Sequence, residues 1–154
     1  MDTVTSTKAQ QPWPWADTQA VARLTAQDGT IDLVVLSGTS GKTLAFGPGH
    51  MAGTAEPGHF GNVVLSGHRD THFAFLKSLG IGDKINLQAS DGNTKVYEVF
   101  GAEVVHQNDV AVAMDAGDDR ITLITCYPFD ALIPGGPMRY VVVAKIISAQ
   151  YLKI

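Results

Sequence analysis

Short segments with alternating apolar and polar residues, or with clustered β-branched residues, dominate the chain. Such runs of about four to eight residues, bounded by Gly, Pro, Asn, Asp or Ser, predict β-strands. Segments of this kind cover residues 21–25, 31–36, 60–65, 84–88, 95–100, 121–126 and 140–147. The sequence Asp91-Gly92-Asn93 is a turn signal, so the strands on either side of it are expected to form a hairpin.

Helical patterns are few. Residues 71–79 carry four large apolar side chains and are followed by Gly80, which predicts one short helix, and a second is expected near residues 42–46. No unit of about 20–50 residues repeats along the sequence. Many short strands joined by glycine-rich turns indicate a closed or nearly closed barrel, so the predicted fold class is mostly β.

The length and composition favour one folded unit. A chain of 154 residues with 45% hydrophobic and 17% charged residues is of single-domain size and should bury about 70% of the surface that its unfolded form exposes. Residues 1–12 are polar and rich in Thr and Gln, which predicts a flexible N-terminal arm. The sequence Pro12-Trp13-Pro14-Trp15 is expected to dock onto a domain that covers residues 13–154.

The charge pattern argues against two classes of partner. The net charge is −4, and the 11 basic residues are scattered, so we predict no nucleic-acid partner. The apolar stretch 140–144 ends at Lys145, far short of the roughly 20 residues that cross a bilayer. We therefore expect this chain to be soluble as given, with any membrane anchor outside it. The neighbouring residues Asp118 and Asp119 are expected in a solvated turn.

Cys126 is the only cysteine, so an intramolecular disulfide is excluded. It ends an apolar strand and directly precedes Tyr127-Pro128, where regular strand pairing is expected to stop. A lone cysteine is either a small buried hydrophobic residue or a nucleophile. Because a thiol with its ordinary pKa of about 8.5 is mostly protonated at neutral pH, a nucleophilic role would require a nearby base or cation.

His68 and Arg139 could supply these groups. His68 follows the apolar run 62–67, so it lies at a strand end as Cys126 does. Arg139 opens the last strand, and its guanidinium could stabilise an oxyanion or grip a substrate carbonyl, although a solvated arginine is the simpler interpretation. Ordinary loop or surface roles are expected for three other histidines, namely His50, His59 and His106.

The spacing of His68 and His72 invites comparison with the zinc-protease motif H-E-x-x-H. Arg69 stands where that motif has its glutamate, and the segment follows a strand rather than lying on a helix. Catalytic zinc is therefore not predicted.

Three features of the sequence resemble the sortases, bacterial enzymes that sort proteins to the cell surface or build pili. Thr122-Leu-Ile-Thr-Cys126 looks like the T-L-x-T-C signature that ends a core strand in this family. His68 lies in a matching S-G-H element 58 residues before the cysteine, and Arg139 lies 13 residues after it. The resemblance extends from about Trp13 to Ile147.

This resemblance implies a closed, eight-stranded sortase-type β-barrel with one or two short helices. It also implies that Cys126 attacks the Thr–Gly carbonyl of an L-P-x-T-G-like motif at the C-terminus of a surface protein and forms a thioacyl enzyme. His68 would act as general acid and then general base, and Arg139 would stabilise the oxyanion or orient the motif. An amine of unknown identity would accept the acyl group, and neither a cofactor nor a metal is implied.

Two segments are similar to the single-domain sortases of proteobacteria: Pro12-Trp-Pro-Trp-Ala-Asp-Thr18 and Cys126-Tyr-Pro-Phe-Asp-Ala131. This resemblance implies a place in the cell envelope, on the extracytoplasmic (periplasmic) face of the inner membrane. Sortases usually carry a membrane-spanning segment at one end, so the anchor is expected outside this chain.

Two alternatives remain open from the sequence. An L,D-transpeptidase also uses Cys and His on a β scaffold, but its cysteine lies in an H-G…S-x-G-C setting that Thr125-Cys126-Tyr127 does not match. A non-catalytic β-barrel binding module would contain Cys126 and His68 merely as packed residues.

Overall fold

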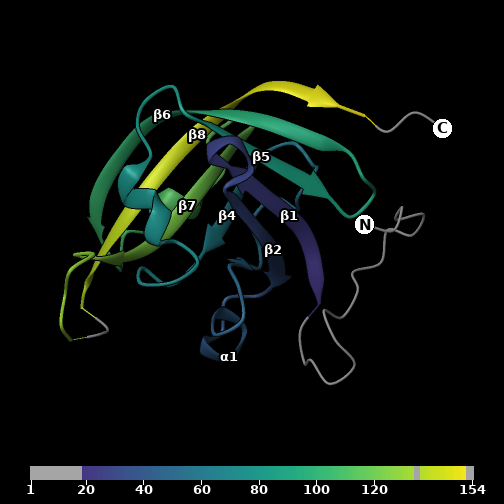
Figure 1. Ribbon diagram of the computed structural model, residues 1–154. Coiled ribbons are helices and arrows are strands. Elements are labelled where there is room, and N and C mark those ends of the chain that lie inside the picture. Colours follow the sequence, from purple (N-terminus) through teal and green to yellow (C-terminus); the bar gives the residue numbers. More distant parts are fainter. Residues whose placement is uncertain (1–18, 134–135, 152–154) are drawn as a thin grey trace.

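The strands close into a β-barrel (Figure 1). The computed structural model describes residues 19–133 and 136–151. The strands in this part are β1 (Ala20–Ala26), β2 (Ile31–Ser37), β3 (Gly49–His50), β4 (Asn62–Ser66), β5 (Lys84–Ala89), β6 (Thr94–His106), β7 (Arg120–Tyr127) and β8 (Met138–Gln150). The helical segments are α1 (Gly41–Leu44) and the 3₁₀ turns η1 (Gln27–Gly29), η2 (Ala74–Ser78) and η3 (Val110–Ala113).

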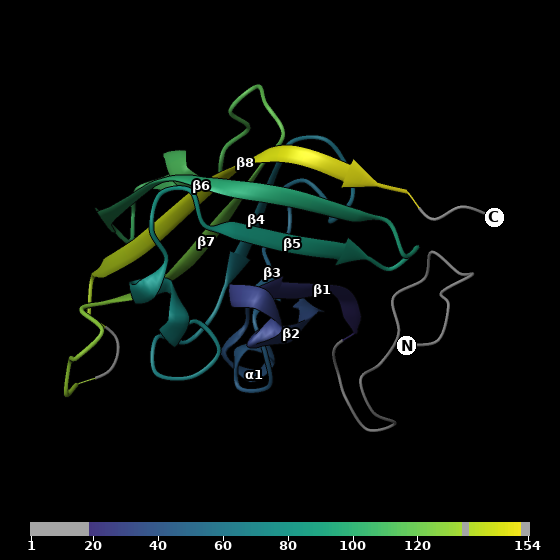
Figure 2. The same ribbon diagram turned by 45° about the horizontal axis from the view of Figure 1, so that its top comes forward.

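The strand order around the barrel is β1-β2-β3-β4-β7-β8-β6-β5. Figure 2 shows β1, β5, β6 and β8 side by side on one part of the wall. Two pairs, β2 with β3 and β4 with β7, are parallel, and the other neighbours are antiparallel. The predicted fold class, a mostly β, closed eight-stranded barrel, is confirmed.

The wall formed by β4, β7 and β8 carries apolar side chains on both faces. Leu65, Leu123 and Val142 belong to the inner core that fills the barrel. Val64, Ile124 and Val141 alternate with them and form a second cluster on the outside, which we call the outer cluster. Burial on both faces explains why β7 has apolar residues at the consecutive positions Leu123 and Ile124 rather than a strict alternation.

The outer cluster lies under other parts of the chain. Met51 packs on it from the segment between β3 and β4, and Val112 and Ala113 pack on it from the β6–β7 connection, residues 107–119. These two segments shield the apolar outer surface of the barrel wall from water.

The predicted strands and the hairpin are confirmed, with shifted ends. β5 and β6 pair from Lys84 with Glu98 to Gln88 with Thr94, and Gly92 in the turn has a φ of 89°, a conformation that glycine adopts without strain. β6 and β8 each run for 13 residues, longer than predicted. The two-residue strand β3 was not predicted, because a segment this short carries no periodicity.

The helix predicted over residues 71–79 is wrong in type and extent. The observed element is the 3₁₀ turn η2, and the turn before it is closed by hydrogen bonds from the backbone N–H groups of Thr71 and Phe73 to the His68 carbonyl. Phe73, Leu76 and Leu79 are buried at a spacing of three residues, which matches about three residues per turn in a 3₁₀ helix. The second predicted helix is present as α1.

None of the helices in the described residues is long and apolar enough to cross a membrane. The predicted arm over residues 1–12 and the docking of Trp13 and Trp15 lie outside the described residues.

A buried ion pair links β6 to the start of β7. Lys95 Nζ lies 2.7 Å from Asp119 Oδ2 and donates to the His59 carbonyl at 3.1 Å. The side chains are only 9% and 11% exposed, so the predicted solvated turn is wrong for Asp119. The reason is that Lys95, at an inward-facing position of β6, requires an anionic partner. Burial and the Asp119 charge raise the pKa of Tyr97, whose hydroxyl lies in the same region.

We expect Lys95→Met to destabilise the protein by about 3–5 kcal/mol, because it leaves the Asp119 carboxylate buried without its cation. Urea unfolding measures this free energy. Lys84→Met, at an exposed position of β5, is the matched control and should change stability by no more than about 0.5 kcal/mol. A Lys95→Met protein as stable as this control would contradict the structural role of the pair.

Candidate active site

Cys126 and Arg139 lie directly opposite each other on neighbouring strands. They are Cα partners in the antiparallel pairing of β7 with β8. Residues opposite each other in such a pair point to the same face of the sheet. Cys126 is partly exposed rather than buried. The thiol and the guanidinium therefore occupy the same face of the barrel wall.

β4 leads to His68 at the same end of the barrel wall, on the side of β7 opposite to β8. The parallel pairing of β4 with β7 ends at Ser66 opposite Ile124. Beyond it, the Gly67 N–H donates to the Ile124 carbonyl at 3.1 Å, and Thr125 Oγ1 donates to the Gly67 carbonyl at 2.7 Å. These bonds keep the chain beside β7 up to Gly67, so His68 directly follows a segment that lies next to the end of β7.

Strand alternation gives Cys126 and Arg139 the face of the outer cluster. Cys126 is two residues beyond Ile124, and Arg139 is two residues before Val141. Ile124 and Val141 both belong to the outer cluster. His68 follows β4, which contributes Val64 to the same cluster. The structure thus places Cys126 and Arg139 on one face at the end of the outer cluster, and the segment that carries His68 begins at the same end of the wall.

The Arg139 guanidinium is fixed by neutral acceptors. Nη1 donates to the carbonyl oxygens of Gly136 at 2.7 Å and Met138 at 2.9 Å, and Nη2 donates to Gln107 Oε1 at 3.1 Å. Since no carboxylate is among these partners, the positive charge of Arg139 is not neutralised by them. Sequence reasoning missed Gln107, because nothing in a single polar residue after a strand indicates its partner.

Asn62 holds the β6–β7 connection over the outer cluster. Its side chain is 4% exposed. Nδ2 donates to the carbonyl oxygens of Val112 at 3.1 Å and Met114 at 3.0 Å, and Oδ1 accepts a hydrogen bond from Thr122 Oγ1 at 2.7 Å. One buried amide therefore fixes η3 to the barrel wall. In the sequence, Asn62 falls within the predicted strand over residues 60–65, and no role was predicted for it.

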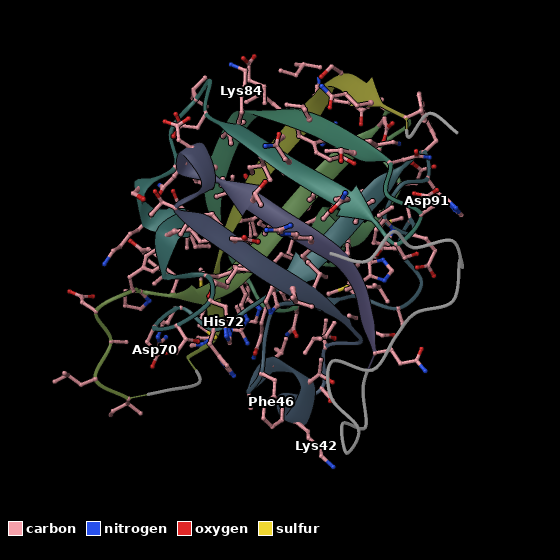
Figure 3. All side chains as sticks on the ribbon, turned by 45° about the vertical axis from the view of Figure 1, so that its right-hand side comes forward. Lys42, Phe46, Asp70, His72, Lys84 and Asp91 are labelled. Atoms are coloured by element: carbon pink, nitrogen blue, oxygen red, sulfur yellow. The ribbon has the colours of Figure 1, made fainter. Side chains whose placement is uncertain are left out.

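Arg69 ties the segment after His68 to the β7–β8 connection. It is 9% exposed, and its Nη2 donates to the Ile133 carbonyl at 3.0 Å. Figure 3 shows the neighbouring Asp70 and His72 on the side of the barrel where the β7–β8 connection projects. Arg69 therefore links two segments beside the site through a hydrogen bond. The comparison with the zinc motif could not indicate this contact.

Three aromatic rings pack where the chain leaves β7. The ring centroids of Tyr127, Phe129 and Tyr140 lie 5.2–6.3 Å apart, and Phe129 and Tyr140 also contact the inner core. The peptide bond between Tyr127 and Pro128 is cis. This packing fixes the backbone directly after Cys126.

His72 is held in its neutral form. Burial first, and then the charge of His68, lower its pKa from the ordinary 6.5. Its Nδ1 is buried without a hydrogen-bond partner among the described residues. The ring is therefore uncharged at neutral pH, so His72 adds no positive charge beside His68.

Comparisons with known proteins agree on one family. The family model described as "Sortase domain" matches residues 24–147. The chain is 32% identical over 118 residues to Sortase D of Bacillus subtilis, an alignment that covers 76% of this chain and 59% of that protein. It is 30% identical over 139 residues to Sortase A of Bacillus anthracis, which covers 88% of this chain and 63% of that protein.

The fold agrees as well. The solved structure of the catalytic domain of B. anthracis SrtD is 32% identical to this chain, superposes with a TM-score of 0.74 and covers 97% of both chains. The chain spans about three fifths of the length of the two curated relatives that it matches.

We expect Gly67→Ala to destabilise the protein by about 1–3 kcal/mol through overpacking. A Cβ at this position would lie 2.7 Å from the Phe73 ring, directly before His68. Gly41→Ala in α1, where a Cβ would meet nothing within 4 Å, is the matched control. Thermal unfolding compares the two, and equal unfolding temperatures would show that Phe73 moves away at no cost.

His72 should contribute to the loss of stability in mild acid. Because its folded pKa lies below the ordinary 6.5, the unfolded chain binds this proton first as the pH falls. The stability from the neutral ring is complete above about pH 6.5 and is lost as the pH falls below it. In His72→Gln the free energy of unfolding should therefore fall less between about pH 7 and pH 5, measured by urea unfolding, while the exposed control His59→Gln keeps the wild-type slope. An unchanged slope in His72→Gln would contradict this assignment.

Proposed function

The chain belongs to the sortase family, and from this premise we propose that it is a cysteine transpeptidase in which Cys126 is the nucleophile, His68 the general acid and base, and Arg139 the stabiliser of the oxyanion. Membership of this family sets aside the L,D-transpeptidase alternative.

One observation carries the proposal. The register of β7 and β8 sets Cys126 opposite Arg139, and β4, which runs parallel to β7, leads into His68 at the same end of the wall. Acyl transfer through a thiol needs a nucleophile, a proton-transfer group and a charge to meet the developing oxyanion, and these three side chains supply one of each.

In the first half of the proposed reaction, the Cys126 thiolate attacks the carbonyl carbon of the scissile peptide bond. The carbonyl electrons move to the oxygen, and Arg139 stabilises the resulting oxyanion. As the carbon–nitrogen bond breaks, His68 gives its proton to the leaving amine. The product is a thioester between Cys126 and the acyl part of the substrate.

In the second half, an amine acceptor attacks the thioester carbon. His68 takes the proton from this amine, the carbon–sulfur bond breaks, and the thiolate is restored. A thioester keeps enough reactivity for this step, so one amide is exchanged for another without an external energy source.

As substrate we propose an L-P-x-T-G-like sorting motif at the C-terminus of a surface protein, cleaved between Thr and Gly. Support for this motif comes from the resemblance of the T-L-x-T-C and S-G-H segments to the sortases, whose substrates carry such a motif. The acceptor is an amine of a cell-envelope component, and its identity is left to experiment.

We further propose the single-domain proteobacterial type, with a catalytic domain over residues 13–154 that works on the periplasmic side of the inner membrane. The segments Pro12-Trp-Pro-Trp-Ala-Asp-Thr18 and Cys126-Tyr-Pro-Phe-Asp-Ala131 support this subtype by their resemblance to that group. Sortases as a family act outside the cytoplasm.

Incubation with a panel of L-P-x-T-G-type peptides and an amine acceptor tests the activity, with mass spectrometry of the ligated product as the measurement. We expect product from the wild type and none from Cys126→Ala. We expect kcat/KM to fall by about 10²–10⁴-fold in His68→Ala and by about 10²–10³-fold in Arg139→Ala, and to be unchanged in His59→Gln. No product from the wild type with any peptide would count against the proposal.

Thiol labelling separates an enzyme from a non-catalytic binding module. In an enzyme, iodoacetamide should label Cys126 of the folded protein faster than it labels the urea-unfolded chain, and His68→Ala should slow the reaction. In a binding module the folded protein would react more slowly than the unfolded chain, and His68→Ala would make no difference.

A further inference from the structure

Gln107 joins the two connections that flank the candidate site. It directly follows β6, where the pairing with β8 ends at His106 opposite Met138. Its backbone N–H donates to the Pro137 carbonyl at 2.7 Å, and its side-chain Oε1 accepts from Arg139 Nη2 at 3.1 Å. The backbone of Gln107 is thus fixed to the end of the β7–β8 connection, and its side chain is directed at the guanidinium.

The hydrogen bonds of Arg139 use only part of its donor set. A guanidinium carries five N–H donors. Both Nη1 donors go to the carbonyl oxygens of Gly136 and Met138, and one Nη2 donor goes to Gln107. Among the described residues, the Nε donor and the second Nη2 donor have no acceptor.

Two of the other arginines use their Nε and Nη2 donors to bind a pair of oxygen atoms. Arg23 binds both carboxylate oxygens of Asp32 through Nε and Nη2, and Arg120 binds Asp118 in the same way. In Arg139 the Nε donor and one Nη2 donor remain for a substrate oxygen, because carbonyl groups accept from Nη1 and Gln107 accepts from Nη2.

The chemical nature of the hydrogen-bond acceptor, the side-chain amide oxygen of Gln107, matters as much as its position. An amide oxygen orients a guanidinium without cancelling its charge, whereas a carboxylate at this position would form an ion pair with it. Preorganisation of a full positive charge is what stabilises an oxyanion without reorganisation during the reaction.

We propose that Gln107 is a positioning residue that aims the Nε–Nη2 edge of Arg139 at the reacting carbonyl, and this rests on the function proposed above. Gln107 is also the first residue of the β6–β7 connection, which Asn62 holds at Val112 and Met114. The guanidinium is therefore fixed to the same segment that covers the outer cluster.

Kinetics of Gln107→Ala and of the near-isosteric Gln107→Met test the proposal. We expect kcat/KM for the peptide to fall about tenfold in both, with most of the loss in kcat, because an oxyanion contact acts in the transition state. Gln88→Ala is the matched control, since Gln88 on β5 also makes one side-chain hydrogen bond, to the Gly92 carbonyl. Circular dichroism at the assay temperature verifies that each variant is folded.

A double-mutant cycle separates positioning from general packing. In the Arg139→Ala background, Gln107→Ala should cause no further loss of kcat/KM, because its effect passes through the guanidinium. An equal tenfold loss in both backgrounds, or wild-type kinetics of Gln107→Ala and Gln107→Met, would overturn the proposal.

A second readout does not depend on peptide turnover. Arg139 should favour alkylation of Cys126 by the anionic iodoacetate over the neutral iodoacetamide, and Gln107→Ala should shift this rate ratio toward that of Arg139→Ala. An unchanged ratio in Gln107→Ala would contradict the role of Gln107. If the wild type turns over no peptide but Gln107→Ala still shifts the rate ratio, the proposed function is overturned. The positioning of Arg139 by Gln107 is then still supported.

Discussion

The parallel pairing of β4 with β7 is the constraint on which the site depends. Two parallel neighbouring strands have their C-terminal ends at the same edge of the wall. The residues that follow β4 and the residues that end β7 therefore lie at one edge. The antiparallel strand β8 then starts at that edge and sets Arg139 opposite Cys126. A slip of one residue in either pairing would turn a catalytic candidate to the wrong face.

Burial on both faces of β7 fixes this register. Ile121 and Leu123 belong to the inner core and Ile124 to the outer cluster. The polar side chains between them are satisfied locally, since Thr122 donates to Asn62 and Thr125 donates to the Gly67 carbonyl. A shifted strand would expose apolar side chains and leave these hydroxyl groups buried without partners.

The arginines of the protein divide into two kinds by their partners. Arg23 and Arg120 form bidentate pairs with Asp32 and Asp118 and lower the pKa of those carboxyl groups. Arg139 instead binds two carbonyl groups and an amide. The first two charges are neutralised by their carboxylate partners, whereas the charge of Arg139 remains available to a substrate. The neutral state of His72 keeps another cation away from the same region.

The sequence by itself determined every strand except β3, the hairpin turn and the three candidate residues, because alternation, turn residues and the T-L-x-T-C motif are local signals. Only the tertiary structure decided what Asn62, Arg69 and Gln107 do, and that Asp119 is buried against Lys95. The first three bind backbone carbonyl groups or a side chain on distant segments, and a carbonyl group is common to every residue type. Such contacts are fixed by the register between strands far apart in the chain, so they leave no pattern that a sequence can display.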